Sequence, residues 1–137
     1  MNEAIREVLG EAGAPPLPEP LAGSIVDSHT HLDTVQDVVG IEPAISLAAA
    51  REVGVTRIAQ IGCDIAGSEF AEELARTHKN VIAAVAIHPN DAARLGRKKI
   101  GDALKRIDEL ANVGNHVRAI GETGIDHFGT TDADGQA

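Results

Sequence analysis

The chain has 137 residues and a formal net charge of −9. Its hydrophobic residues make up 43% and its charged residues 24%, which is ordinary globular usage and excludes a disordered or fibrous chain. An acidic chain repels a polyanion unless a metal or a local basic patch reverses the field. Charge by itself therefore argues against a general nucleic-acid-binding protein.

The cysteine content and the apolar runs predict the compartment. Cys63 is the only cysteine and has no partner for an internal disulfide, and the first residues do not resemble a secretion signal. The longest apolar run, residues 81–87, is far shorter than the roughly 20 residues that a membrane helix needs. We therefore expect a cytoplasmic protein without a membrane span.

The first 22 residues differ in pattern from the rest of the chain. Residues 2–11 predict a short helix, for which Asn2 is a candidate N-cap. Four of the six prolines fall in residues 14–20 and favour an extended connector. We expect an N-terminal extension over residues 1–22 and one domain over residues 23–137.

From residue 23 the pattern predicts strands that alternate with helices. Ser68 is a candidate N-cap for the second of these helices. The expected strands cover residues 25–31, 55–61, 81–87 and 117–121, and the expected helices cover residues 43–53, 68–78 and 99–113. This alternation predicts an α/β fold with a parallel sheet, whose strands end at one common edge.

A His-x-His pair lies at the end of the first expected strand. Strand alternation puts Asp27, His29 and His31 on one face, so both imidazoles can converge on one metal ion. Two polar residues at a strand end, without a metal, are the alternative interpretation.

Glu122 and His88 follow two other strands. Glu122 comes directly after an apolar strand, where an unpaired charge is costly, so we expect a metal or a cation beside it. An ion pair with Arg118 is the alternative. His88 precedes a proline after the third strand, where it can contact a substrate, bind a metal, support a ligand or simply belong to the loop.

Two further features have a plain structural interpretation. Arg94, Arg97, Lys98 and Lys99 are expected in the loop after the third strand. Cations at a helix start oppose the helix dipole, so they either serve an anionic substrate or belong to a solvated loop. Cys63 is expected to pack at a strand end rather than to act as a nucleophile.

Four stretches, in this order, resemble the TatD family of metal-dependent hydrolases, often described as deoxyribonucleases: DSHTHLD, GCD, AIHPND and AIGETGID. The resemblance runs from about residue 23 to about residue 128. It implies a TIM barrel with one or two divalent metals at its mouth, without distinguishing Mg, Mn and Zn. It also implies hydrolysis of phosphodiester bonds in DNA by a metal-activated water.

The resemblance also implies roles for individual residues. His29 and His31 match the paired histidines that hold one metal, and Glu122 matches the catalytic glutamate that bridges the metals. His88 is expected to position the substrate. Asp27 and Asp126 are expected to contact the metal ligands without binding the metal and to hold those ligands in place.

The chain departs from the family pattern in two residues and in length. Ala86 stands where glycine is more usual, and His127 where an aromatic residue is usual. A TIM barrel has about 250 residues, so we expect only its first half, four strands of a (β/α)8 barrel with part of the ligand set. Activity of these 137 residues alone is therefore open.

Exposed edges of such a half-barrel invite self-association. A non-catalytic interaction module is therefore one alternative function. An amidohydrolase-type metallohydrolase that acts on a small molecule is another.

Overall fold

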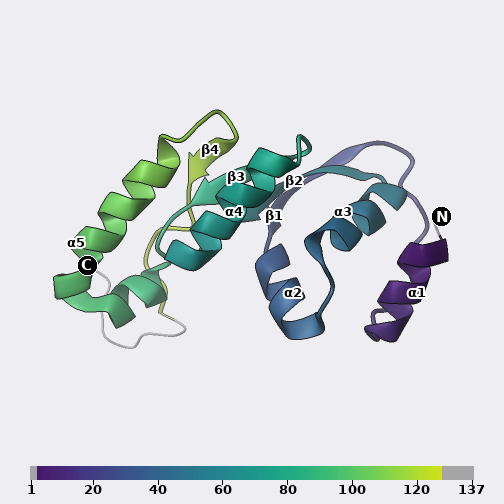
Figure 1. Ribbon diagram of the computed structural model, residues 1–137, viewed down its shortest axis with the longest axis horizontal. Coiled ribbons are helices and arrows are strands. Elements are labelled where there is room, and N and C mark those ends of the chain that lie inside the picture. The colour runs from purple at the N-terminus through teal and green to yellow at the C-terminus, as the bar shows by residue number, and fades with distance from the viewer. Residues whose placement is uncertain (1–2, 128–137) are drawn as a thin grey trace. The chain divides into compact units, whose positions relative to one another are not determined.

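Four parallel strands alternate with helices along the chain (Figure 1) and form a sheet in the order β1-β2-β3-β4. The computed structural model describes residues 3–127, so Asn2 lies outside the described residues. The strands are β1 (Ile25–Thr30), β2 (Val55–Ile61), β3 (Val81–Val85) and β4 (Val117–Ile120). The helices are α1 (Glu3–Glu11), α2 (Leu32–Val39), α3 (Pro43–Glu52), α4 (Ile65–Thr77) and α5 (Pro89–Ala111). This architecture confirms the predicted α/β class, and the strand order is that of four consecutive strands of a (β/α)8 barrel.

The chain divides into two compact units, residues 1–59 (unit 1) and residues 60–137 (unit 2). In unit 1, Ile5 and Leu9 of α1 form a buried cluster with Ile41 and with Ala49 of α3. The N-terminal helix therefore contributes to the core of unit 1. The predicted boundary at residue 22 stays a prediction.

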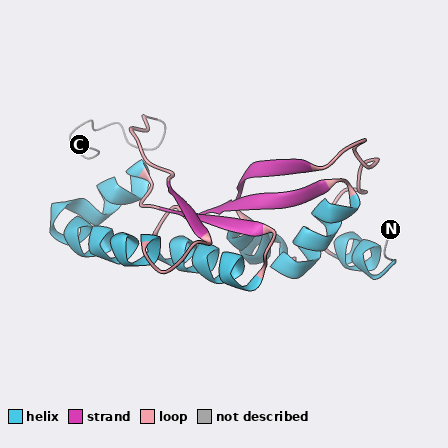
Figure 2. Cartoon of the chain, turned by 90° about the horizontal axis from the view of Figure 1, so that it is seen from above, coloured by secondary structure: helices cyan, strands magenta, loops and turns pink. Residues whose placement is uncertain are grey.

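In unit 2, α4 and α5 lie on the same side of the strands (Figure 2). The buried side chains are mostly small or aliphatic, which lets the helices pack close to β3. They include Ala71, Leu74, Ala75, Ala83, Ala84, Val85, Ile107 and Leu110. Within residues 3–127 no helix is both long enough and apolar enough to cross a membrane.

Three helices differ from the prediction at their starts. Helix α2 was not predicted at all. Helix α4 begins at Ile65 rather than at Ser68, because the carboxylate of Asp64 accepts a hydrogen bond from the backbone N–H of Gly67 (2.7 Å) and caps it. Helix α5 begins at Pro89, in the first-turn position that proline favours, rather than at residue 99.

The early start of α5 also corrects the position of the four basic residues. They lie within helix α5, not in a loop. The helix is interrupted at Gly96, whose φ of 67° and ψ of 170° are not helical. A second helical segment therefore begins at Arg97.

Helix α4 approaches the end of β2 so closely that no side chain fits between them. A Cβ at Gly62 would lie 2.5 Å from both Cα and Oγ of Ser68. Ser68 is fully buried; its hydroxyl donates to the carbonyl of Ala86 (3.1 Å) and accepts from the N–H of Ala86 (3.2 Å). One side chain thus fastens α4 to the segment that follows β3.

We predict that Gly62→Ala lowers the free energy of unfolding by at least about 2 kcal/mol, because the added methyl overlaps helix backbone that cannot move aside easily. Gly101→Ala is the matched control. Apart from its chain neighbours and the backbone of its own helix, no atom lies within 4 Å of its new Cβ, and alanine in a helix interior is favoured over glycine by about 0.5–1 kcal/mol. Chemical denaturation of both variants measures the difference. Equal stabilities would contradict the close approach.

Candidate metal and catalytic centre

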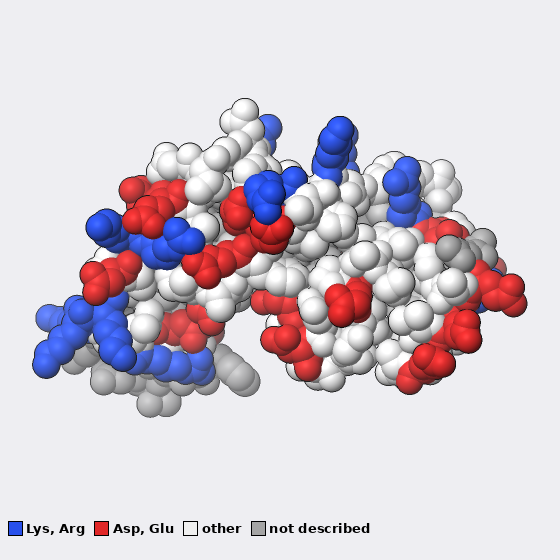
Figure 3. Space-filling view, in the orientation of Figure 1, with Lys and Arg blue, Asp and Glu red and all other residues white. Residues whose placement is uncertain are grey.

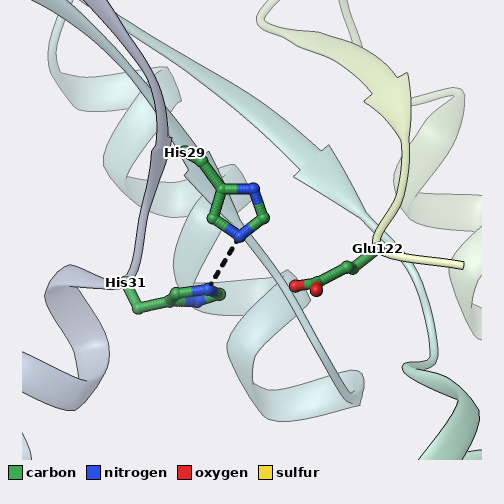
Figure 4. A group of neighbouring side chains, drawn as sticks. All are labelled: His29, His31 and Glu122. Carbon is green, nitrogen blue, oxygen red and sulfur yellow. Dashed lines mark hydrogen bonds between the residues drawn. The ribbon is translucent and has the colours of Figure 1, made fainter. Parts of the chain in front are cut away.

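The first part of the candidate centre is a pair of histidines in unit 1. His29 belongs to β1, and His31 is the residue before α2. Their Nε2 atoms lie 3.1 Å apart, joined by the dashed line in Figure 4. Two imidazole nitrogens bound to one tetrahedral zinc ion would lie about 3.3 Å apart, given zinc–nitrogen bonds of about 2.0–2.1 Å. The pair is therefore arranged as two ligands of one ion would be.

Asp27 lies two residues before His29 on the same strand. Its carboxylate Oδ1 accepts a hydrogen bond from the backbone N–H of His29 (3.1 Å). This contact braces the main chain that carries the His29 imidazole. Asp27 is thus in a position to support His29.

Glu122 lies in unit 2, directly after β4, and is drawn in Figure 4. Its side chain is 37% exposed, so the carboxylate is reachable from solvent. An ion pair with an arginine such as Arg118 stays the alternative interpretation of Glu122.

His88 connects the end of β3 to the start of α5. Its Nδ1 accepts a hydrogen bond from the backbone N–H of Asn90 (3.2 Å) and caps the helix. A ring that accepts at Nδ1 carries its proton on Nε2. That Nε2 lies 3.9 Å from Oε1 of Glu122 and 3.8 Å from Oδ2 of Asp126. His88 thus directs an N–H towards two carboxylates.

Asn90 and Cys63 also contact these carboxylates, although no such role was expected for either. The amide Nδ2 of Asn90 donates to Oδ2 of Asp126 (2.9 Å). The thiol of Cys63 donates to Oε2 of Glu122 (3.7 Å), and the carbonyl of Cys63 accepts from the N–H of His88 (2.7 Å). Cys63 therefore does more than fill space at a strand end. The sequence signal was its position, at the same sheet edge as the polar residues after β3 and β4.

Unit 2 thus gathers five polar side chains where β2, β3 and β4 end: Cys63, His88, Asn90, Glu122 and Asp126. Carboxylates, imidazoles and thiols are the side chains that hold divalent metals in proteins. They are also the side chains that move protons in hydrolysis. Chemically, this edge can bind a cation or position a reacting water.

Comparison with known proteins places this arrangement in a family. The model of the family described as TatD related DNase matches residues 26–136. An "Uncharacterized metal-dependent hydrolase TatD" from Mycobacterium tuberculosis (strain ATCC 25618 / H37Rv) is 35% identical over 117 residues. That match covers 82% of this chain and 41% of the relative, so the chain spans less than half of the relative's length.

The family model covers most of the chain and includes the polar residues after β1, β3 and β4. The resemblance seen in the four sequence stretches is thereby confirmed, and the chain belongs to the TatD family.

Proposed function

We propose that this protein is a divalent-metal-dependent hydrolase that cuts phosphodiester bonds in DNA. The observation that carries the proposal is the 3.1 Å separation of the His29 and His31 Nε2 atoms in a chain of this family. The M. tuberculosis relative is itself called a metal-dependent hydrolase, which supports the metal requirement. The description of the family as TatD related DNase supports DNA as the proposed substrate.

His29, His31 and Glu122 are the proposed metal ligands, each offering one donor atom of a suitable kind. His29 lies near the end of β1, His31 follows β1 and Glu122 follows β4, so all three stand at carboxyl ends of strands, where (β/α)8 enzymes carry their active sites. A divalent ion held there would lower the pKa of a bound water and neutralise charge on a phosphate oxygen. The two imidazole nitrogens suit Zn²⁺, and the carboxylate also suits Mn²⁺ and Mg²⁺, so the donor set does not choose among these three ions or between one ion and two.

The other residues of the centre have supporting tasks in this proposal. Asp27 braces the backbone of His29, and Asp126 is held by Asn90. His88 presents its Nε2–H towards Glu122 and Asp126, where it can donate a hydrogen bond to a phosphate oxygen of the substrate. His88 is thus the proposed substrate-positioning residue.

We predict that the double substitution His29→Ala and Glu122→Ala weakens the binding of Mn²⁺ and Zn²⁺ at least tenfold, because it removes two of the three donors. The matched control is His78→Ala with Glu19→Ala, which removes the same residue types elsewhere. Isothermal titration calorimetry measures both affinities. Equal affinities for the two double variants would contradict the proposed ligands.

Hydrolysis is tested with end-labelled single-stranded DNA and Mn²⁺ or Mg²⁺. We expect cleavage that EDTA abolishes and that Glu122→Gln slows at least a hundredfold, about 2.7 kcal/mol of transition-state stabilisation. The measurement is the rate of product formation on a denaturing gel. Turnover of a small ester or amide without cleavage of DNA would support the small-molecule alternative instead.

A non-catalytic interaction module is a second candidate, favoured by apolar side chains on the strands. Val26 of β1 is 58% exposed and Ile120 of β4 is 60% exposed. Uncovered apolar strand residues are prone to pair with another chain.

We predict for this candidate a dimer or larger species in size-exclusion chromatography with light scattering. Val26→Thr with Ile120→Thr should shift it to monomer, because both substitutions keep β propensity and remove apolar surface. A parent chain that is monomeric at every concentration would contradict self-association.

A further inference from the structure

Half of the Lys and Arg residues fall in one stretch of α5. Residues 94–106 hold six of the chain's 12 cations and one acidic residue, Asp102. One of the six, Arg106, is already engaged. It contacts Glu69 of α4 at 2.8 Å and Glu109 at 3.1 Å, and the hydrogen bond to Glu69, followed by that to Glu109, raises its pKa.

Four of the others surround the break at Gly96. We call them the basic group, namely Arg94, Arg97, Lys98 and Lys99. All four are exposed. Arg94 pairs with Asp91 at 2.8 Å, whereas no ion pair within residues 3–127 involves any of the other three.

The break gives these cations an unfavourable local setting. Arg97, Lys98 and Lys99 occupy the first turn of the second segment of α5, where the partial positive charge of the helix start repels them. They also repel one another. An anion bound there would relieve both effects.

A hollow of about 400 Å³ adjoins the basic group, and Arg94, Leu95 and Lys99 form one of its sides. Asp91 and the residues at the start of α4, Asp64 to Ala66, also line it. The carboxylates of the hollow are engaged locally, Asp64 with the N–H of Gly67 and Asp91 with Arg94. Figure 3 shows Lys and Arg side chains gathered over the α5 end of the molecule.

The hollow lies on the functional edge of unit 2. Helices α4 and α5 are the next elements after β2 and β3, and His88 is the residue before α5. Both the hollow and His88 therefore lie where these strands end.

We propose that the basic group binds backbone phosphates of a nucleic-acid strand and holds that strand beside the bond to be cut. The proposal rests on the proposed function for the identity of the substrate. Flexible cations around an open hollow bind phosphates without reading the base sequence. The basic group would therefore contribute affinity and not sequence preference.

The test measures how a fluorescein-labelled 12-nucleotide DNA strand binds to the full 137-residue chain. Binding is monitored by fluorescence anisotropy in a buffer that contains EDTA. We expect Arg97→Gln with Lys98→Gln and Lys99→Gln to raise Kd at least tenfold at 50 mM salt. The slope of log Kd against log salt should fall by about 2, since each phosphate contact on a single strand contributes about 0.7. Thermal unfolding checks that the variant folds.

The matched control is Arg51→Gln with Lys79→Gln and Lys105→Gln. It removes one exposed arginine and two exposed lysines elsewhere, so the net charge changes equally. Its Kd should change less than about twofold. Equal weakening of DNA binding in both variants would overturn the proposal, and so would a parent chain that does not bind the strand. Displacement of the strand by polyglutamate as efficiently as by unlabelled DNA would also overturn it. Because no metal is present, these outcomes are independent of whether the protein hydrolyses DNA.

Discussion

The close contact between Gly62 and Ser68 is the constraint on which the edge of unit 2 depends. With no side chain at Gly62, the second turn of α4 rests directly on the end of β2, and the Ser68 hydroxyl reaches both backbone groups of Ala86. Cys63 directly follows Gly62, His88 lies two residues after Ala86, and a backbone hydrogen bond joins Cys63 and His88. A buried hydroxyl that satisfies two backbone groups is costly to lose, so the anchors resist sliding of α4 against β3. The contacts of Gly62, Ser68 and Ala86 therefore fix the backbone that carries Cys63 and His88.

Much of the candidate site could be predicted because strand alternation and strand ends are visible in a sequence. His29 and His31 are two residues apart, so the expected strand over residues 25–31 predicts their side chains on one face, although β1 itself ends at Thr30. Glu122 is conspicuous as a charge after an apolar strand. The participation of Cys63 and Asn90 was not predictable in this way. It depends on where the turns after β2 and β3 direct the side chains, and turn geometry brings Cys63 to Glu122, 59 residues along the chain.

The strands were predicted more closely than the starts of the helices. Strand β2 matches the predicted residues, whereas α2 was missed because Thr34, Val35 and two further valines have low helix propensity. Its end is marked by Gly40, with a φ of 76°, but a glycine alone does not reveal the helix before it. Helix α5 begins at Pro89, before the predicted start at residue 99, and it is interrupted at Gly96. Tertiary packing and a local cap decide such starts, and neither has a periodic signal.

The distribution of charge in α5 changes what the net charge of −9 means for function. Salt screens charges beyond about 8 Å at physiological ionic strength, so a phosphate experiences its neighbours rather than the whole chain. Within unit 2 the carboxylates of Glu122 and Asp126 follow β4, whereas the basic group lies around the break at Gly96 in α5. Carboxylates attract a metal and repel phosphate, while lysines do the reverse. Because the two sets lie on separate elements, each keeps its own local charge although the chain as a whole is acidic.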